Sequence, residues 1–264
     1  MNTFQYHLAG NTKSAKDAFQ NHENTKFLSG GMTLLPSMKH GLIAPDHLVD
    51  VSRISDLQVL EETSEHLSIG AAIKHDTVAM SAVVQKAIPG LAYLAGQIGD
   101  PQVRVRGTIG GSIANNDPAA DYPAGALALK AMIVTDQRII LAEDFFTGFY
   151  STALEDGEVI TQVKFCKPLQ SAYAKCKQMA SGYALAGVFI AVFPQQEIRV
   201  AVTGVGPGVF RWPEAEQAFL NGQTKPELQR DDLMSDLHAS SAYRVNMAQV
   251  LFHQAAQSIH HHSS

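Results

Sequence analysis

The stretch Thr108-Ile109-Gly110-Gly111-Ser112, continued by residues 113–123, decides how this chain is interpreted. Two adjacent glycines follow a threonine and precede short polar side chains. Glycine adopts backbone angles closed to other residues, and without a Cβ atom it lets a ligand approach the chain closely. Successive N–H groups in such a turn can point into one concavity and hold an anion such as phosphate. The stretch indicates a phosphate-binding turn; a glycine pair that only turns the chain is the alternative.

Asp121 lies downstream of this turn, where a ribose hydroxyl could donate a hydrogen bond to it. Its alternative role is that of N-cap for a helix beginning at Tyr122-Pro123. The two roles are compatible, because a carboxylate has several acceptor sites.

A second stretch has the same character: Phe27-Leu28-Ser29-Gly30-Gly31-Met32-Thr33-Leu34-Leu35-Pro36. It reads as an apolar run, a glycine pair, a hydroxyl and a helix start, since proline suits the first helical turn. Two glycine-rich turns, each with a threonine, predict a grip on the two phosphates of a dinucleotide from opposite sides.

With Ser37-Met38-Lys39 after it, the Phe27 stretch resembles the signature AGG-x-(S/T/D)-L-L-P-x-M-K of the FAD-binding medium subunit of molybdenum hydroxylases, the xanthine dehydrogenase and carbon monoxide dehydrogenase type enzymes. With residues 98–104 before it, the Thr108 stretch resembles the same family's I-G-x-x-Q-V-R-N-x-G-T-I-G-G-N signature. The resemblance continues through residues 144–148, 157–160, 175–177 and 182–184. It therefore covers nearly the whole chain in the family's order.

The resemblance implies an FAD site made of Phe27, Leu28, Ser29, Gly30, Gly31, Met32, Thr33, Leu34, Ile98, Thr108, Ile109, Gly110, Gly111, Ser112, Asp121, Ile160, Lys177 and Tyr183. By this resemblance, residues 27–34 match the first FAD loop, and residues 108–112 match the pyrophosphate loop. Asp121 meets the ribose side, and Ile98 and Ile160 are apolar positions against the cofactor.

Lys177 matches a lysine near the flavin, where it would stabilise the negative charge of the reduced ring. Tyr183 matches an aromatic residue beside the isoalloxazine, which a tyrosine can stack on or shield. The alternatives are a solvated strand lysine and a core tyrosine. For Arg104 and Arg106, a structural role is favoured over a phosphate contact.

Three positions depart from the family pattern. Ser112 and Val105 stand where asparagine is frequent, which puts the Ser112 contact in doubt. Met32 stands where some flavoproteins of the wider fold place a histidine bonded covalently to flavin. Methionine cannot form that bond, so the expected FAD is non-covalent.

The expected fold class is α+β, with a two-lobed FAD-binding domain of the vanillyl-alcohol-oxidase/PCMH type over residues 1–168, in lobes of about 1–54 and 55–168. A β-α-β-α-β order is typical of the first lobe. In the second lobe, residues 57–62 and 66–72 predict a hairpin and residues 122–131 a helix. Residues 169–264 are expected to form a C-terminal domain, with three antiparallel strands at 172–179, 184–193 and 198–205, and helices at 214–220, 227–237 and 242–258.

Composition narrows the class of protein. The 264 residues carry a formal charge of −5, which argues against a nucleic-acid binder. The N-terminus is no signal peptide, and no window reaches the roughly 18 apolar residues of a membrane span, so a cytoplasmic location is expected, although a signal-bearing partner could export a folded complex. His260, His261 and His262 are a tag remnant or a native tail and are not taken as a metal site.

The cysteine count bears on partners. Cys166 and Cys176 cannot ligate an iron–sulfur cluster that needs four thiolates, so any cluster belongs to another chain; small buried hydrophobes are the favoured interpretation for both.

The function expected from the resemblance is an oxidoreductase flavoprotein subunit, with no catalytic residue of its own. It would pass electrons from iron–sulfur clusters through FAD to NAD or another acceptor, beside an iron–sulfur subunit and a molybdenum-cofactor subunit. A free-standing FAD-dependent reductase of the same wider fold and a non-catalytic nucleotide-binding assembly subunit are the alternatives. The sequence names neither the substrate nor the acceptor.

Overall fold

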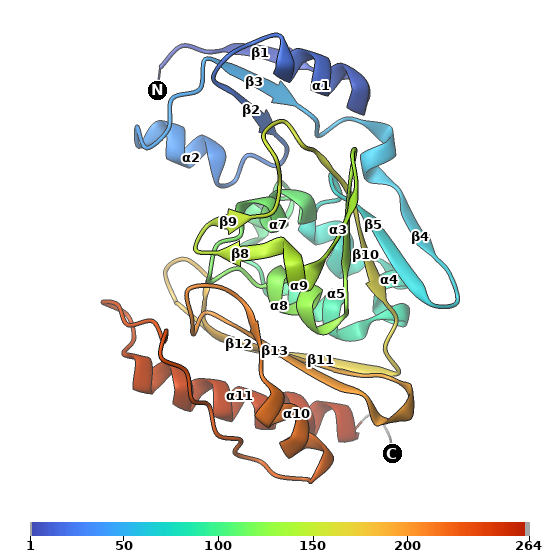
Figure 1. Cartoon of the computed structure of the whole chain (residues 1–264), viewed down its shortest axis with the longest axis vertical. Coiled ribbons are helices and arrows are strands. Elements are labelled where there is room, and N and C mark those ends of the chain that lie inside the picture. Colours follow the sequence, from blue (N-terminus) through green and yellow to red (C-terminus); the bar gives the residue numbers. More distant parts are fainter. Residues whose placement is uncertain (1, 262–264) are drawn as a thin grey trace.

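The computed structural model describes residues 2–261, and its first fifty residues form the predicted β-α-β-α-β unit (Figure 1). Its elements are β1 (Gln5–Leu8), α1 (Thr12–Gln20), β2 (Thr25–Leu28), α2 (Leu34–Lys39) and β3 (His47–Asp50). The strands are parallel, in the order β1-β3-β2. Helix α1 begins at a capping box in which Asn11 and Ser14 satisfy each other's backbone N–H groups, and it buries Ala15 against Val49.

A five-stranded antiparallel sheet forms the centre of the chain, in the order β4-β5-β10-β6-β7. Its strands are β4 (Leu60–Glu62), β5 (His66–Gly70), β6 (Met132–Thr135), β7 (Ile139–Leu141) and β10 (Ile160–Cys166), and a small hairpin pairs β8 (Phe146–Gly148) with β9 (Ser151–Thr152). The associated helices are α3 (His75–Met80), α4 (Ala82–Ala87), α5 (Pro89–Gly96), α6 (Pro101–Arg104), α7 (Ile109–Asn115), α8 (Tyr122–Ala128) and α9 (Ala142–Phe145).

The C-terminal part is a four-stranded antiparallel sheet, so the prediction of three strands is wrong. The strands are β11 (Gln170–Lys177), β12 (Ala184–Val192), β13 (Ile198–Thr203) and β14 (Phe210–Arg211). A glycine-rich turn at residues 204–208 returns the chain, and β14 pairs with β13 over only two residues, too few for an alternating pattern to register.

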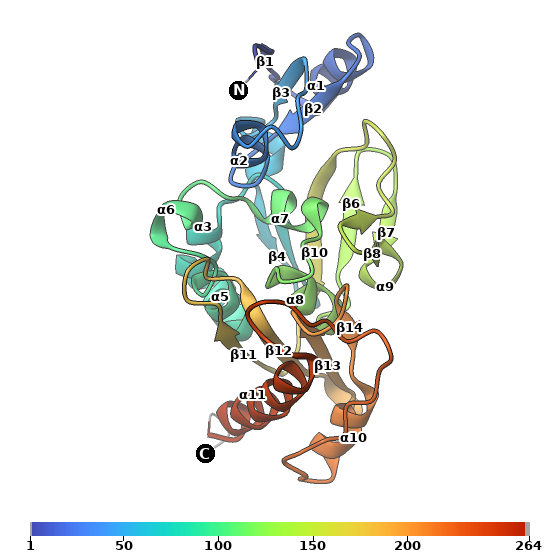
Figure 2. The same cartoon turned by 90° about the vertical axis from the view of Figure 1, so that its left-hand side faces the viewer.

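Helices α10 (Pro213–Leu220) and α11 (Ser241–His261) lie below this sheet, on the side away from the rest of the molecule (Figures 1 and 2). The opposite face packs inward, because Tyr173 of β11 and Phe189 of β12 share one core with Leu91 and Leu94 of α5. The domain boundary expected near Lys167 stays a prediction.

Three further predictions about elements are wrong. Residues 227–237 form no helix, because their polar groups are held from outside the segment: Trp212 Nε1 donates to the Glu227 carbonyl, and Arg244 donates to the Asp236 carboxylate. Helix α8 ends at Ala128 rather than residue 131, before Lys130 takes a positive φ of 51°. Residues 55–58 form a 3-10 helix, so strand β4 starts only at Leu60.

At the end of the chain, the His260 ring stacks on Phe219 with centroids 5.4 Å apart, and His262 lies outside the described residues. Over residues 2–261, no helix has the length and apolar character that crossing a membrane requires.

Candidate functional site

A cavity of about 640 Å³ is lined by both glycine pairs, and this volume falls in the usual range for a small-molecule or cofactor site. All but three of the residues predicted for FAD line it: Phe27, Ser29, Gly30, Gly31, Met32, Thr33, Leu34, Ile98, Thr108, Gly110, Gly111, Ser112, Asp121, Ile160 and Tyr183. Leu28, Ile109 and Lys177 do not line it.

The first glycine segment, residues 29–33, presents unpaired backbone. Gly31 has a φ of +74°, which glycine adopts without strain, and its carbonyl accepts from Leu35 N at the start of α2. The N–H groups of residues 30–33 donate to no protein acceptor within the described chain. Four successive free donors beside a cavity are the arrangement that holds a phosphate.

The second segment is the first turn of α7 rather than a free turn. The N–H groups of Ile109 and Gly110 donate to the carbonyls of Ile73 and Ala71, and that of Gly111 to the N-cap hydroxyl of Thr108. The predicted turn of free amide groups is therefore wrong for this segment. Glycine is needed here for space, because a Cβ on residue 110 would lie 2.5 Å from the Ala71 Cβ.

The two segments are in direct contact. Ser29 Oγ and Thr108 Oγ1 share a hydrogen bond of 2.9 Å, and a Cβ on Gly30 would lie 2.6 Å from the Gly107 Cα. A side chain at residue 30 would force them apart, so the two loops predicted to lie on opposite sides of a ligand form one continuous wall.

Asp121 stands at the N-cap position of α8 but makes no capping hydrogen bond, so that alternative is wrong. Its carboxylate accepts from Tyr173 Oη at 2.5 Å and from Lys175 Nζ at 2.8 Å. The Asp121 and Lys175 side chains are 4% and 1% exposed. Burial raises the pKa of Asp121 and lowers that of Lys175, and their ion pair opposes both shifts.

Lys175 is a residue that sequence analysis missed. Strand alternation puts Tyr173 and Lys175 on one face of β11, because they are two positions apart, but it puts Lys177 there as well. Lys177 lies beyond a register shift in the β11–β12 pairing, and it is exposed at the end of the strand. Its charge still acts on Asp121, lowering the pKa of that carboxyl.

Tyr183 follows the turn between β11 and β12 and remains 40% exposed. Gly182, with a φ of +73°, packs on Gly99, where a Cβ would lie 2.9 Å from its Cα. This contact brings the turn to the cavity. Burial, with Asp117 and Asp121 nearby, raises the pKa of the Tyr183 phenol, which keeps it protonated as a donor.

Two further lining residues, His75 and Glu158, were not predicted for the site. His75 is buried, and burial together with Arg104 lowers its pKa to about 4, so it is neutral at physiological pH. Its Nδ1 has no hydrogen-bond partner among the described residues. Glu158 is bound by Arg138, by the Glu155 N–H and by the Thr135 hydroxyl, which together lower its pKa to about 2 against the opposing effect of burial.

The cavity can hold an elongated molecule with unlike ends. Unpaired amide donors at residues 30–33 suit a diphosphate, while Ile98, Ile160 and Tyr183 supply apolar and aromatic surface for a flat ring. The glycine wall lets such a ligand lie against the backbone.

Comparison with known proteins matches this chain to an FAD-binding family. The family described as the FAD binding domain in molybdopterin dehydrogenase matches residues 2–168. The glyceraldehyde dehydrogenase medium chain of Sulfolobus acidocaldarius is 30% identical, covering 97% of this chain and 98% of that protein. The carbon monoxide dehydrogenase medium chain of Hydrogenophaga pseudoflava is 36% identical over 79% of this chain and 77% of its own length.

Solved structures agree. A chain of carbon monoxide dehydrogenase from Hydrogenophaga pseudoflava, in a form lacking the Mo-pyranopterin moiety of its cofactor, superposes with a TM-score of 0.88 at 31% identity, covering 98% of both chains. A chain of the Cu,Mo-containing CO dehydrogenase, in its cyanide-inactivated form, gives a TM-score of 0.85 at 28% identity with the same coverage.

Proposed function

This chain belongs to the family of FAD-binding medium subunits of molybdenum hydroxylases, and we propose that it carries electrons between a partner's iron–sulfur clusters and an external acceptor. It is an FAD-binding subunit of an oxidoreductase. The observation that carries the proposal is the run of free amide donors at residues 30–33, opening on a cavity that also holds the second glycine segment.

When bound, FAD would accept electrons one at a time and release them two at a time, which links one-electron carriers to a two-electron acceptor. In our assignment the N–H groups of residues 30–33 bind its diphosphate, and the hydroxyls of Thr108 and Ser112 line the same region. Asp121, held by Lys175 and Tyr173, accepts from the ribose side with a carboxylate oriented in advance. Ile98, Ile160 and Tyr183 exclude water from the ring. Lys177 adds positive charge near this region from outside the wall.

Binding is proposed to be non-covalent. Met32 lines the cavity where a covalently bonding residue would be needed, and a thioether forms no such bond with flavin. FAD should therefore leave the protein on denaturation.

The partners are proposed to be an iron–sulfur subunit and a molybdenum-cofactor subunit, because the relatives named above are medium chains of multi-subunit dehydrogenases. Cys166 and Cys176 are free thiols on different strands, so this chain offers no cluster of its own. NAD is one acceptor that such a subunit could serve.

The test is a visible spectrum of the purified chain before and after addition of FAD. We expect the absorption bands of oxidised flavin to remain with the protein after gel filtration, and to be released by acid. A colourless protein that cannot be reconstituted would contradict the proposal.

Co-purification separates the alternatives. A subunit brings iron–sulfur and molybdenum chains with it, whereas a free-standing reductase does not. Rapid NADH–dye oxidoreductase activity of the isolated chain would exclude a purely structural assembly subunit.

A further inference from the structure

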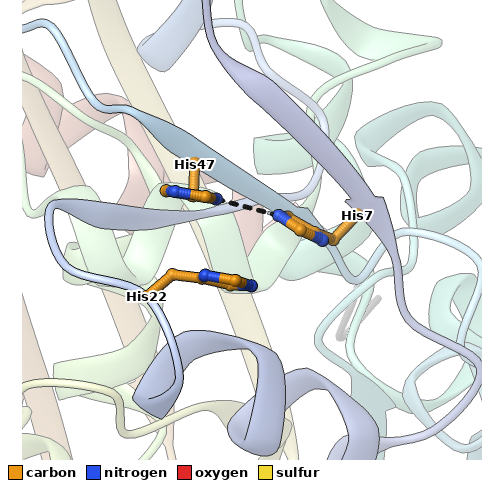
Figure 3. A group of neighbouring side chains, drawn as sticks. All are labelled: His7, His22 and His47. Atoms are coloured by element: carbon orange, nitrogen blue, oxygen red, sulfur yellow. Dashed lines mark hydrogen bonds between the residues drawn. The ribbon is translucent and has the colours of Figure 1, made fainter.

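Three histidines gather in the first fifty residues (Figure 3), and none of them lines the cavity. His7 lies on β1, His47 on β3, and His22 in the connection between α1 and β2. One ring nitrogen from each lies within 4.8 Å of the others. All three side chains are half-buried, so they retain contact with solvent.

Sheet register explains why they meet. In the parallel pairing of β1 and β3, His7 lies opposite Val49, and Gln5 lies opposite His47. His7 and His47 therefore project from the same face of neighbouring strands, the face on which Val49 packs with Ala15 of α1. His22 comes two residues after the last residue of α1, which brings it over the same face.

The three rings contact one another: each pair is stacked, with centroids 4.1–5.2 Å apart. His7 Nε2 and His47 Nδ1 share one hydrogen bond of 2.9 Å, and His22 stacks on His47 with centroids 4.1 Å apart and an interplanar angle of 5°. No hydrogen bond joins the His22 ring to another described residue. The neutral imidazole ring is the form that binds metal.

We propose that His7, His22 and His47 form a binding site for a divalent transition-metal ion of the Zn²⁺ class. Imidazole is a preferred ligand of Zn²⁺, and three histidines leave a fourth position for water. The site also lies at the C-terminal end of α1, whose last turn holds no basic residue and whose dipole favours a cation.

Binding requires small rearrangements. A Zn–N distance of about 2.0–2.1 Å in tetrahedral geometry separates ligand nitrogens by about 3.4 Å, so the 2.9 Å hydrogen-bonded pair of His7 and His47 must open slightly. The proton shared in that bond moves to the other nitrogen of its ring, so no net proton is released. His22 must rotate out of the stack, which its half-exposed position in a connection permits.

The ion would join β1, β3 and the segment entering β2, and residues 29–33 follow β2 directly. Its role would be structural, holding together the lobe that carries the free amide donors. Because a ligand bound only by the folded state stabilises that state, Zn²⁺ should raise the melting temperature of the chain.

The experiment uses the full chain with His260, His261 and His262 changed to alanine, so that terminal histidines cannot bind the probe. Zn²⁺ is titrated by calorimetry, and Co²⁺ is added as a spectroscopic substitute. We expect one ion per chain, a visible Co²⁺ ligand-field band, and a higher melting temperature with Zn²⁺.

His22→Ala and, separately, His47→Gln should weaken Zn²⁺ binding by at least about tenfold, since each removes a direct ligand. His40→Ala, an exposed histidine of the same lobe outside the cluster, is the matched control and should bind as the parent does. No binding by the parent, or equal binding by the parent and the two cluster variants, would overturn the proposal. If His47→Gln fails to fold, His22→Ala alone decides, because it alters only a connection.

Discussion

The two glycine pairs look alike in sequence and differ in how their backbone is used. At Gly30-Gly31 the chain takes a positive φ and leaves a run of N–H groups without a protein acceptor. At Gly110-Gly111 the chain is helical, and the two N–H groups donate to the Ala71 carbonyl and to the Thr108 hydroxyl. One pair therefore offers donors to a ligand, whereas the other offers a surface without Cβ atoms.

This difference shows that a glycine pair in the sequence does not by itself predict free backbone N–H groups that could hold an anion. The second segment is rigid before any ligand arrives, because each glycine amide already has its acceptor. The first is held in place by contact with the second, through Ser29, Thr108 and the close approach of Gly30 to Gly107. Ligand binding should protect the free amides of the first segment and leave the second segment unchanged.

The largest expected effect comes from Gly111→Asp. A Cβ at residue 111 meets only Thr108 Oγ1, at 3.0 Å, so the chain should still fold. The new carboxylate would face the space assigned to phosphate, and we expect FAD uptake to be lost, as measured by flavin absorbance after gel filtration. Gly111→Asn keeps the size without the charge and should retain more FAD. Equal retention by both variants would contradict the assignment of the phosphate.

Gly30→Ala tests the contact between the segments. Its Cβ would lie 2.6 Å from the Gly107 Cα, which is backbone and cannot move aside cheaply. We expect a loss of about 3 kcal/mol in the free energy of unfolding, measured in urea, and weaker FAD binding. The control is Gly10→Ala, where the new Cβ has nothing within 4 Å. Similar stability of the two variants would show that the segments are not in contact.

The comparison between free and bound polar groups also applies to a charged residue of the cavity wall, Glu158. Glu158 is fully committed to protein partners, like the second glycine segment, and its pKa is lowered from 4.5 to about 2. A carboxyl with a lowered folded pKa stabilises the fold above its unfolded pKa, and this stability is lost as pH falls from about 4.5 to about 2. We expect a loss of about 2 kcal/mol, since Arg138 is half-exposed and screened by solvent.

The measurement is the free energy of unfolding of the chain and of Glu158→Gln across this pH range. The variant should lack this component of the decline, although it is less stable at neutral pH. Parallel curves for the two proteins would show that Glu158 does not titrate as assigned.

The smallest effect is expected at the hydroxyl bridge. Thr108→Val removes both the cap on Gly111 N and the bond to Ser29, and should cost about 1 kcal/mol. Ser29→Ala removes only the bridge and should cost less. In a double-mutant cycle, a coupling energy indistinguishable from zero would show that the bridge does not join the segments.

Sequence analysis predicted the elements that rest on strong local patterns. The β-α-β-α-β order of the first fifty residues is as expected, and most residues predicted for FAD line one cavity, because alternating strands and glycine pairs leave local signals. It could not predict that the Gly110 amide would be bound, since its acceptor, the Ala71 carbonyl, comes from a segment far away in sequence. Strand β14 was missed for the same reason, as only pairing with β13 defines its two residues.

The two lysines of β11 show what sequence analysis could not predict within a single strand. Lys175 and Lys177 both fit an alternating pattern with Tyr173, and the register shift after Cys176 separates them. Only the fold reveals that Lys175 is the one paired with Asp121.

Hydrogen exchange of the backbone amides, followed by mass spectrometry with and without FAD, tests the central contrast most directly. We predict that FAD slows exchange strongly in residues 29–33, and that residues 109–112 exchange slowly in both states because their amides are already bound. Unchanged exchange at residues 29–33 beside new protection at residues 109–112 would contradict the account.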